Sequence, residues 1–581
     1  MKFQELSHYF SLIEQESSRL GMTRLLAEVL GKASPSEASI ICNLSLGQLH
    51  PPYIGTQFNI ADKNLIKVVA QLLHRSQQET EAAVKISGDI GLIVQEGTWV
   101  PEQELTVRQI YTALKHIEVI SGTGSQEEKN NQLHELLKNV DPNSAKFIAR
   151  IVLGKLRLGF SDMTIIDALS WMHAGDKSLK DVIEDAYNVC VDIGLIAQEL
   201  KEKGVQALQQ MHVKVGIPIR PAAAERLPTA AAIIEKIGAC VAQPKLDGFR
   251  LQVHLDKTHV TPRIHFFSRH LQDMSHMFPD LTQEVAKLDV QSVICEGEAI
   301  VFDPNTGNFL PFQETVKRKR KHGIEEVMQE FPLQLFLFDI LYLNGKDLME
   351  QDHEARRAQL LSIVKNYSGD IIRIDDEIPI TTAKELGHYF LHNIESGLEG
   401  LVVKRPNAEY KPGKRNFNWI KLKRQEEGHI EDTLDCVVLG YYAGEGKRAS
   451  FGIGAFLVGI YNKDEDRFET IAKIGTGLKD HDWKDLKKKC DAIAIPHQPK
   501  NAYCDKSLIP DVWVDPQIIC LVRADEITLS PVHGTGKTAS KLGYALRFPR
   551  FMGYRPDKGP EETTTVKEVE RLFNDQYARK I

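Results

Sequence analysis

Paired cysteines are missing from this sequence. The eight cysteines lie scattered between Cys42 and Cys520, and none belongs to a C-x-x-C pair. Because zinc sites and small disulfide frameworks need closely spaced cysteines, the sequence favours neither. We expect reduced, structural thiols in a cytoplasmic protein.

Long apolar segments are missing too. No run approaches the roughly 20 apolar residues that a membrane-spanning helix needs, and residues 1–5 lack the hydrophobic core of a signal peptide. Internal repeats and low-complexity tracts are also absent. We therefore expect a protein without a membrane partner.

The sequence also lacks an excess of basic residues. The chain has 72 Lys+Arg against 79 Asp+Glu, which gives a formal net charge of −7. A nucleic-acid binder can still be acidic overall if its cations cluster on one face. Composition thus leaves DNA binding open, and the function has to be inferred from sites.

The length of 581 residues suggests about three domains. Residues 1–211 read as the first of them. Apolar residues recur at steps of three or four between Ile183 and Leu200, the period of one helix face, and Asp141-Pro142 is a favourable helix start. Strand-like alternation is scarce here, so we predict an all-α domain.

The pattern changes after the Pro-containing stretch 216–221, and residues 212–427 form the second predicted domain. In Leu251–Leu255 apolar residues alternate with Gln252 and His254, which indicates a half-buried strand. No regular alternation of strands with helices is evident, so mainly antiparallel α+β structure is predicted. Further strands are expected at Ile264–Phe267, Val293–Phe302, Leu333–Leu343 and Glu399–Lys404.

Short strands dominate residues 428–581, the third predicted domain. The turn Asn462–Asp466 separates two of them like a hairpin. Several short strands within about 130 residues indicate an all-β domain, a small barrel of the OB type. The expected strands are Cys436–Tyr442, Ala455–Tyr461, Phe468–Ile474, Ile518–Val522 and Glu526–Leu529.

The segment Gln243–Arg250 carries the main chemical signal, a K-x-D-G-x-R motif. A lysine in a turn before a strand, here Lys245, can place an amine beside a phosphate. Gly248 permits close backbone approach, and Arg250 offers a bidentate donor. Taken alone the motif is short, and a surface turn is an equally good interpretation.

Further motifs follow in order: Ser268-Arg269, Glu296-Gly297-Glu298, Phe338-Asp339, Glu399–Lys404, Trp419–Lys423, Arg547–Phe551 and Arg555–Lys558. With them the sequence closely resembles the covalent nucleotidyltransferases and, among these, the three-domain ATP-dependent DNA ligases of the replicative, archaeal and eukaryotic type. The resemblance extends from the helical region to the C-terminal motifs. It implies an all-α DNA-binding domain, an α+β adenylation domain and an OB-fold domain.

The resemblance implies an enzyme that seals nicks in duplex DNA in replication, repair and recombination. ATP would adenylate Lys245, AMP would pass to the 5′-phosphate, and the 3′-hydroxyl would then attack and release AMP. Lys245 must be neutral to attack, and nearby cations favour that form. Lys421 and Lys423, which alternate onto the strand face of Trp419, are expected to supply them and to stabilise phosphate charge. Without the other motifs these lysines read as a solvated strand edge.

Carboxylates are the expected ligands of Mg²⁺ (or Mn²⁺), because hard divalent ions prefer oxygen. Glu298 and Glu399 are the main candidates, and Asp247 is a weaker one. In the resembled family the residue at the position of Glu298 contacts either metal or ribose, and the sequence does not decide between them. Glu399 stands in an apolar run, where a lone charge needs a partner.

The implied nucleotide pocket uses Phe338 against the adenine ring, with core packing as the alternative interpretation. Arg250, Arg269 and Arg415 are the implied nucleotide or phosphate contacts. One position departs from the family pattern: many relatives carry Glu two residues before the lysine, where this chain has Gln243. A Gln still hydrogen-bonds the adenine edge, but with a different donor and acceptor pattern.

Contacts to DNA and pyrophosphate are implied near both ends. The C-terminal motif is expected to orient pyrophosphate and then to swing away, and without the resemblance it reads as a solvated basic tail. Its cations are Arg547, Arg550, Arg555 and Lys558. In the helical domain, residues 121–125 and 156–159 are expected to meet DNA phosphates. We expect a monomer that encircles nicked duplex DNA. A sliding-clamp partner is left open, because Ser7 stands where a clamp-binding peptide has an aliphatic residue.

Two other patterns have weaker interpretations. Gly534–Thr538 resembles the end of a P-loop, but Pro531 occupies the first glycine position and no strand–loop–helix context is evident. The run Lys317–Lys321 is interpreted as a localisation signal, as solvated charge or, because it follows Phe312-Gln313 as in the resembled family, as a contact to DNA phosphates.

Rival functions share part of this pattern. A capping guanylyltransferase or RNA ligase has the lysine motif and the nucleotidyltransferase core, but the large helical domain and the last motif favour a DNA ligase. NAD-dependent ligases usually carry a four-Cys zinc module, which this sequence lacks. A non-catalytic DNA clamp or scaffold is the alternative of a different class, and it needs no nucleophile facing paired cations.

Overall fold

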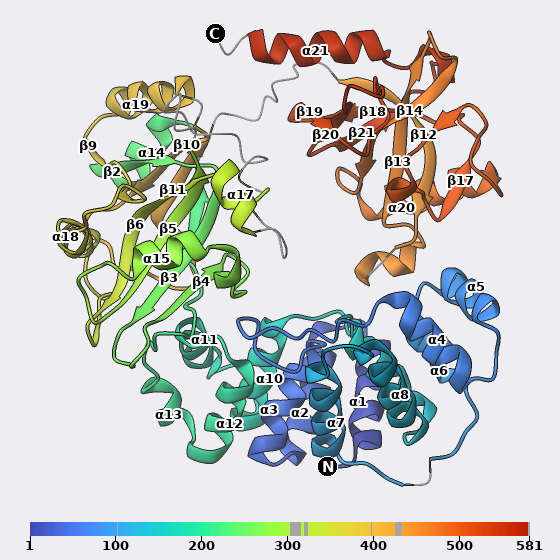
Figure 1. Cartoon of the computed structure of the whole chain (residues 1–581), viewed down its shortest axis with the longest axis horizontal. Coiled ribbons are helices and arrows are strands. Elements are labelled where there is room, and N and C mark those ends of the chain that lie inside the picture. The colour runs from blue at the N-terminus through green and yellow to red at the C-terminus, as the bar shows by residue number, and fades with distance from the viewer. Residues whose placement is uncertain are drawn as a thin grey trace. The chain divides into compact units, whose positions relative to one another are not determined.

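The computed structural model describes residues 1–101, 103–302, 315, 317–318, 324–396, 398–423, 433–444 and 446–578. The chain divides into two compact units, Met1–Lys423 and Arg424–Ile581, whose elements are labelled in Figure 1. Within the described ranges, none of the helices has the length and apolar content needed to cross a membrane.

Helices form the first part of the unit Met1–Lys423, as predicted. Asp141 caps the helix that starts at Pro142, because its carboxylate accepts the backbone N–H groups of Asn143 and Ser144, each at 3.1 Å. The helices share one core, in which the rings of Phe10 and Phe147 meet edge-on. The helices are α1 (Phe3–Gln15), α2 (Arg19–Lys32), α3 (Pro35–Ser45), α4 (Asp62–Leu72), α5 (Gln77–Ser87), α6 (Ile90–Gln95), α7 (Val107–Val119), α8 (Ser125–Lys138), α9 (Pro142–Val152), α10 (Asp162–Ala174), α11 (Lys180–Val189), α12 (Ile193–Lys203) and α13 (Val205–Gln209).

The apolar steps between Ile183 and Leu200 belong to two helices, so the prediction of one helix face was wrong. Helix α11 ends at Val189, and Cys190 is extended. Asp192 then starts α12 by accepting the backbone N–H of Leu195 at 2.9 Å. Because both helices bury their apolar residues in the same core, the three- or four-residue spacing of apolar residues continues across the break between α11 and α12.

Two sheets form the second part of this unit, one in the order β1-β11-β10-β2-β9 and one in the order β4-β3-β5-β6-β7 with β8 beside β6. All pairs are antiparallel except β1–β11 and β6–β8, so the prediction of mainly antiparallel α+β structure is confirmed. The strands are β1 (Ala223–Arg226), β2 (Cys240–Lys245), β3 (Phe249–Asp256), β4 (Arg263–Ser268), β5 (Ser292–Val301), β6 (Leu333–Leu343), β7 (Lys346–Asp347), β8 (Ile372–Ile374), β9 (Ile378–Ile380), β10 (Gly400–Lys404) and β11 (Arg415–Lys423); the helices are α14 (Ala230–Ile237), α15 (Pro279–Val285), α17 (Ile324–Glu330), α18 (His353–Val364) and α19 (Ala383–Glu395).

Strand β3 corrects one prediction, because the strand expected to be half-buried is buried on both faces. Gln252 and His254 are both buried. The Gln252 amide exchanges hydrogen bonds of 2.7 and 3.0 Å with the backbone of Ile219, and the Gly216 N–H donates to His254 Nδ1 at 3.0 Å. The stretch 216–221 thus covers this face and supplies the polar partners that buried polar side chains need.

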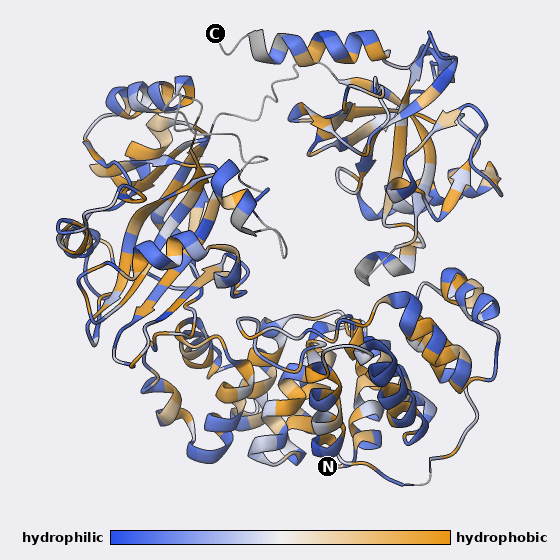
Figure 2. Ribbon diagram, in the orientation of Figure 1, coloured by the Kyte–Doolittle hydropathy of each residue, from blue (hydrophilic) through white to orange (hydrophobic). Residues whose placement is uncertain are grey.

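Strands dominate the second unit, and in Figure 2 strands of both units contain many residues coloured as hydrophobic. The predicted turn Asn462–Asp466 connects β13 and β14, which pair antiparallel. One sheet has the order β15-β17-β12-β13-β14-β16, extended from β12 by β18 and then β21, and β19 pairs with β20. All eight cysteines of the chain are free thiols, as expected. The elements are β12 (Leu434–Tyr442), β13 (Ala455–Asn462), β14 (Arg467–Ile474), α20 (Asp480–Ala492), β15 (Ala494–Ile495), β16 (Ala502–Tyr503), β17 (Val512–Val514), β18 (Ile519–Arg523), β19 (Glu526–Ser530), β20 (Gly543–Arg547), β21 (Arg550–Tyr554) and α21 (Val566–Ala578).

Candidate active site

Three neighbouring strands bring Lys245, Glu399 and Lys423 together. Strand β10 lies between β2 and β11, and its first residue, Gly400, is paired with Lys245 on one side and with Lys423 on the other. Glu399 directly precedes β10, and its backbone N–H donates to the carbonyl of Lys245 at 3.2 Å. The strand register therefore gathers these side chains at one edge of the sheet.

The Glu399 carboxylate bridges the two lysines. One oxygen pairs with Lys245 Nζ and the other with Lys423 Nζ, and each of the three side chains keeps between 25% and 30% of its surface exposed. Burial acts to raise the pKa of Glu399, but the two ammonium groups outweigh it and hold that pKa below its ordinary value. The charge of Glu399, which stands in an apolar run, is thus balanced by two lysines.

The predicted cation cluster gathers around Lys421. Partial burial lowers the pKa of Lys421, and four neighbouring cations lower it further. In order of effect these cations are Lys423, Arg415, Arg269 and Lys245. Because like charges in close proximity disfavour one another, this arrangement attracts a polyanion such as a nucleotide triphosphate.

The turn after Lys245 is tightly packed. A Cβ at Gly248 would lie 2.4 Å from the carbonyl oxygen of Ala299, so only glycine fits there. The Gly248 N–H donates to Glu298 Oε1 at 3.1 Å. Glu298 is partly exposed, yet burial raises its pKa to about 7 against the opposing effect of Lys245. A carboxyl group with such a pKa is stabilised in its ionised form by an added cation.

Two aromatic rings, those of Phe338 and Trp419, lie beside Arg250, which follows this turn. The guanidinium of Arg250 stands 5.5 Å from the centroid of Phe338 and 5.6 Å from that of Trp419. Its Nη2 donates to both oxygens of Glu296, at 3.0 and 2.9 Å. Arg250 is therefore held against the two rings by Glu296, a contact that the sequence motif did not indicate.

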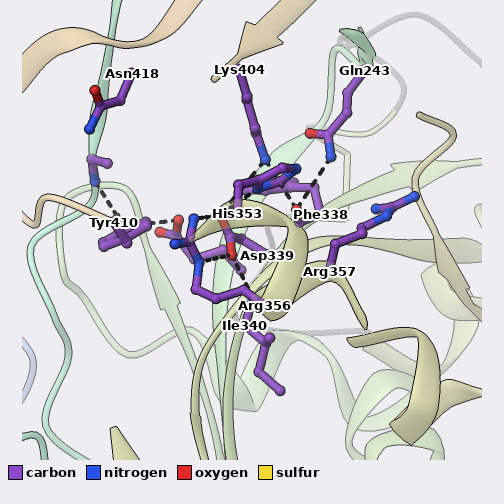
Figure 3. A network of polar contacts seen from close by, with 12 residues as sticks. Gln243, Phe338, Asp339, Ile340, His353, Arg356, Arg357, Lys404, Tyr410 and Asn418 are labelled. Atoms are coloured by element: carbon purple, nitrogen blue, oxygen red, sulfur yellow. Dashed lines mark hydrogen bonds and ion pairs between the residues drawn. The ribbon is translucent and has the colours of Figure 1, made fainter. Parts of the chain in front are cut away.

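A buried polar network fixes the strand that carries Phe338 (Figure 3). Asp339 accepts from Arg356 Nε at 2.8 Å and lies 3.8 Å from Lys404 Nζ. His353 Nε2 and Gln243 Nε2 both contact Glu377 Oε2 at 2.7 Å. Asp339 in an apolar run was a signal for a buried partner, and Lys404 ends the motif Glu399–Lys404. Nothing in the sequence pointed to His353, Arg356 or Glu377.

The cations of the C-terminal motif lie in the unit Arg424–Ile581 and are paired within it. Arg547 contacts Glu526 at 2.5 Å, and Arg550 contacts Asp525 at 3.4 Å. Asp435 accepts from both Arg555, at 3.1 Å, and Lys558, at 2.6 Å. The interpretation as a solvated basic tail is wrong, since these residues belong to folded strands and turns.

The structure also bears on the two weaker sequence patterns, Gly534–Thr538 and Lys317–Lys321. Gly534–Thr538 follows β19, but β20 comes next instead of a helix, so the P-loop interpretation fails. Arg318 is buried and paired with Asp280 at 2.7 Å, which removes it from contact with DNA. The other residues of its run, apart from Lys317, and the preceding Phe312-Gln313 lie outside the described residues.

The residues present fit a divalent cation held together with a nucleotide. In the described part of the chain no group of three or more His, Cys, Asp or Glu side chains forms a metal site. Mg²⁺ at nucleotide sites commonly takes one or two carboxylates and completes its shell with phosphate and water oxygens. Glu298, Glu399 and Asp247 supply such oxygens beside Lys245.

Three family models match successive parts of the chain. They are "DNA ligase N terminus" at residues 2–170, "ATP dependent DNA ligase domain" at residues 221–423 and "ATP dependent DNA ligase C terminal region" at residues 449–558. The second match contains every residue of the lysine site described above, from Gln243 to Lys423.

Known relatives match over the full length. The "Probable DNA ligase" of Dictyoglomus thermophilum is 44% identical over 583 residues, which cover 100% of this chain and 99% of the relative. The "DNA ligase" of Saccharolobus solfataricus is 35% identical over 601 residues, with coverage of 100% and 98%. The solved structure Pmar-Lig_Pre is 16% identical, covers 94% of this chain and 98% of its own, and has a TM-score of 0.56. At that identity the likeness shows the fold alone.

Proposed function

The chain belongs to the ATP-dependent DNA ligase family, and from this premise we propose that Lys245 is the nucleophile that carries AMP. The resemblance inferred from the motifs is thereby confirmed, and the enzyme is a ligase that uses ATP. The observation that carries the proposal for Lys245 is its ion pair with Glu399, which Lys423 shares at the aligned ends of three strands.

The first chemical step is lysine adenylation. The Nζ of Lys245 forms a bond to the α-phosphorus of ATP, the bond to the bridging oxygen breaks, and pyrophosphate leaves. The ammonium group of Lys245 must lose one proton to become a nucleophilic amine, and Glu399 is the proton acceptor in contact with it. The cluster around Lys421 stabilises charge on the phosphate oxygens. AMP then passes to the 5′-phosphate of a nick, and the 3′-hydroxyl displaces it.

Membership of the family also supports our proposals for the domains, the C-terminal cations and the partners. Residues 1–211, 212–427 and 428–581 are the proposed DNA-binding, adenylation and OB-fold domains. The OB-type barrel is favoured by the antiparallel strands β12, β13 and β14. The cations of the last motif would engage pyrophosphate or DNA by exchanging their carboxylate partners for phosphate. The proposed partner is nicked duplex DNA and the proposed form is a monomer, whereas sliding-clamp binding and the cytoplasmic location stay predictions from the sequence.

Mapping the adduct tests the nucleophile. After incubation with α-labelled ATP and Mg²⁺, the protein is digested at neutral or alkaline pH, which preserves a phosphoramide bond. We expect AMP on the peptide that contains Lys245. AMP on the peptide that contains Lys421 and Lys423 would overturn the assignment.

We propose that Glu298, Glu399 and Asp247 hold the Mg²⁺ (or Mn²⁺), which when bound neutralises phosphate charge as a Lewis acid. Because the pKa of Glu298 is raised to about 7, protons compete with the cation below that pH. The Mg²⁺ concentration that half-saturates adenylation should therefore rise about tenfold from pH 8 to pH 6. Titrating Mg²⁺ at both pH values measures this.

Glu298→Gln is the matching variant, because it removes the titrating group while keeping its size. We expect the Mg²⁺ requirement of this variant to be higher and to lose its dependence on pH. An unchanged Mg²⁺ requirement together with a raised KM for ATP would assign Glu298 to the ribose.

We propose that Phe338 stacks on the adenine ring. Phe338→Ala should raise the KM for ATP about fivefold, because an aromatic stacking contact contributes on the order of 1 kcal/mol. Phe338→Tyr keeps the ring and should keep KM within about twofold. If Phe338→Ala lowers the melting temperature and leaves KM unchanged, the ring serves core packing.

A further inference from the structure

The side-chain amide of Gln243 has both of its hydrogens engaged inside the protein. Gln243 is buried on β2, and its Nε2 donates to Glu377 Oε2 at 2.7 Å. The same nitrogen lies 3.5 Å from the backbone carbonyl oxygen of Phe338, at the long limit of a hydrogen bond. An amide nitrogen carries two hydrogens, so this group has none left for a ligand.

The orientation of this amide is set by the chemistry of Glu377. Burial acts to raise the pKa of Glu377, but its hydrogen bond with His353 and the nearby Arg357 keep that pKa below its ordinary value. An ionised carboxylate only accepts hydrogen bonds, and the oxygen that Gln243 contacts is also contacted by His353 Nε2 at 2.7 Å. Gln243 must therefore turn its nitrogen, and never its oxygen, toward Glu377.

The oxygen of Gln243 is consequently directed away from Glu377. Gln243 and Lys245 are two residues apart on β2, and alternate residues of a strand share one face. Phe338 adjoins the same face, where Lys404 Nζ holds its carbonyl at 3.1 Å. Gln243, Phe338 and Lys404 are labelled in Figure 3. A base stacked on Phe338, with its α-phosphate at Lys245, would thus have its edge near this oxygen.

We propose that Glu377 is a specificity-determining positioning residue, which holds Gln243 so that only a hydrogen-bond acceptor meets position 6 of the purine. The inference rests on the proposed function, which places the base against Phe338. Adenine presents a donor amino group there and is accepted. A 6-oxo purine presents an oxygen, and two acceptors that face each other without water are disfavoured. The Gln that departs from the family pattern then performs the role of an acceptor-only Glu.

The test compares ATP with ITP, which replaces the 6-amino group of adenine by oxygen. Single-turnover labelling of Lys245 is followed with each nucleotide, and selectivity is the ratio of the two kcat/KM values. We expect a ratio of about 100 or more for the unaltered enzyme, because a polar group is left unpaired in the wrong complex. Equal use of ATP and ITP by the unaltered enzyme overturns the inference, without any variant having to fold.

Three variants separate positioning from structure. In Glu377→Gln the new amide donates to Gln243 Oε1 and allows its nitrogen to face the base, so the ratio should fall at least about tenfold. In Gln243→Glu/Glu377→Gln the carboxylate again faces the base, so the ratio should return toward that of the unaltered enzyme. Asp376→Asn removes the same charge from the adjacent, exposed residue and should leave the ratio unchanged.

The outcomes distinguish this inference from the proposed function. A Glu377→Gln enzyme that keeps the full ratio, or a double variant that does not recover it, overturns the role of Glu377 while Lys245 remains the nucleophile. If the unaltered enzyme takes no label from any nucleotide, and Lys245→Ala behaves the same, the proposed function itself fails.

Discussion

Replacing Lys245 with alanine should abolish the sealing of nicked DNA, with a loss on the order of 10³-fold or more. The amine at the end of β2 is the atom to which AMP is joined, so the variant lacks the nucleophile of the first step. Lys421 and Lys423 would still bind phosphate, so ATP affinity should change much less. Sealing rate and equilibrium ATP binding are measured on the same preparation.

A nick that already carries AMP on its 5′-phosphate provides the control. Because only the last displacement remains for such DNA, Lys245→Ala should join it at a rate within about tenfold of the unaltered enzyme. Lys245→Arg is the matched charged variant and should fail on ordinary nicks, since a guanidinium stays protonated. If Lys245→Ala still seals ordinary nicks, the amine is not the nucleophile and a scaffold role has to be reconsidered.

Replacing Asp339 with asparagine should destabilise the adenylation part of the chain by about 3–5 kcal/mol. Asp339 is buried and balances Arg356, whose side chain is 0% exposed, and Lys404, at 1%. Removing its charge takes the carboxylate partner from two cations in a low-dielectric interior. Hydrogen exchange of the β6 and α18 peptides measures the local loss, because a chain of two units does not unfold in one step.

The stability that Asp339 contributes should decrease in acid. Although burial opposes it, Arg356 and Lys404 depress the pKa of Asp339 far below its ordinary value. A depressed pKa contributes stability above the unfolded-state pKa near 4, and that contribution is lost as the pH falls through the folded-state value. The difference between Asp339→Asn and the unaltered protein should therefore be constant from pH 5 to 8 and shrink in acid. Asp376→Asn, at an exposed carboxylate, is the control and should change little; equal losses in both variants would contradict the account.

Much of the strand pattern could be predicted from the sequence. The strand predicted at 333–343 has the bounds of β6, and the predicted bounds of β5 and β13 differ from the observed ones by at most one residue. These strands could be predicted because the two-residue period is a local property of each strand. The start of α9 could be predicted for the same reason, because its cap and its first residue are neighbours in the sequence. The break between α11 and α12 was missed, because apolar spacing continues across it and only the cap at Asp192 marks it.

The site could be predicted only in part. The motifs named Lys245, Glu399 and Lys423, yet their contact depends on β10 pairing with both β2 and β11, which no single segment encodes. The burial of Gln252 depends likewise on the backbone of 216–221. Glu377 carries no motif, and its link to Gln243 spans 134 positions. Long-range partners of this kind become visible only in the fold.

The most direct test of the central claim is a label-transfer chase. The protein is incubated with α-labelled ATP, GTP or NAD and Mg²⁺, and then receives nicked duplex DNA or nicked RNA. We predict that ATP labels the protein, that Lys245→Ala takes no label, and that nicked DNA discharges the label as its strands join. Labelling by GTP or NAD in place of ATP, or discharge only onto RNA, would contradict this prediction.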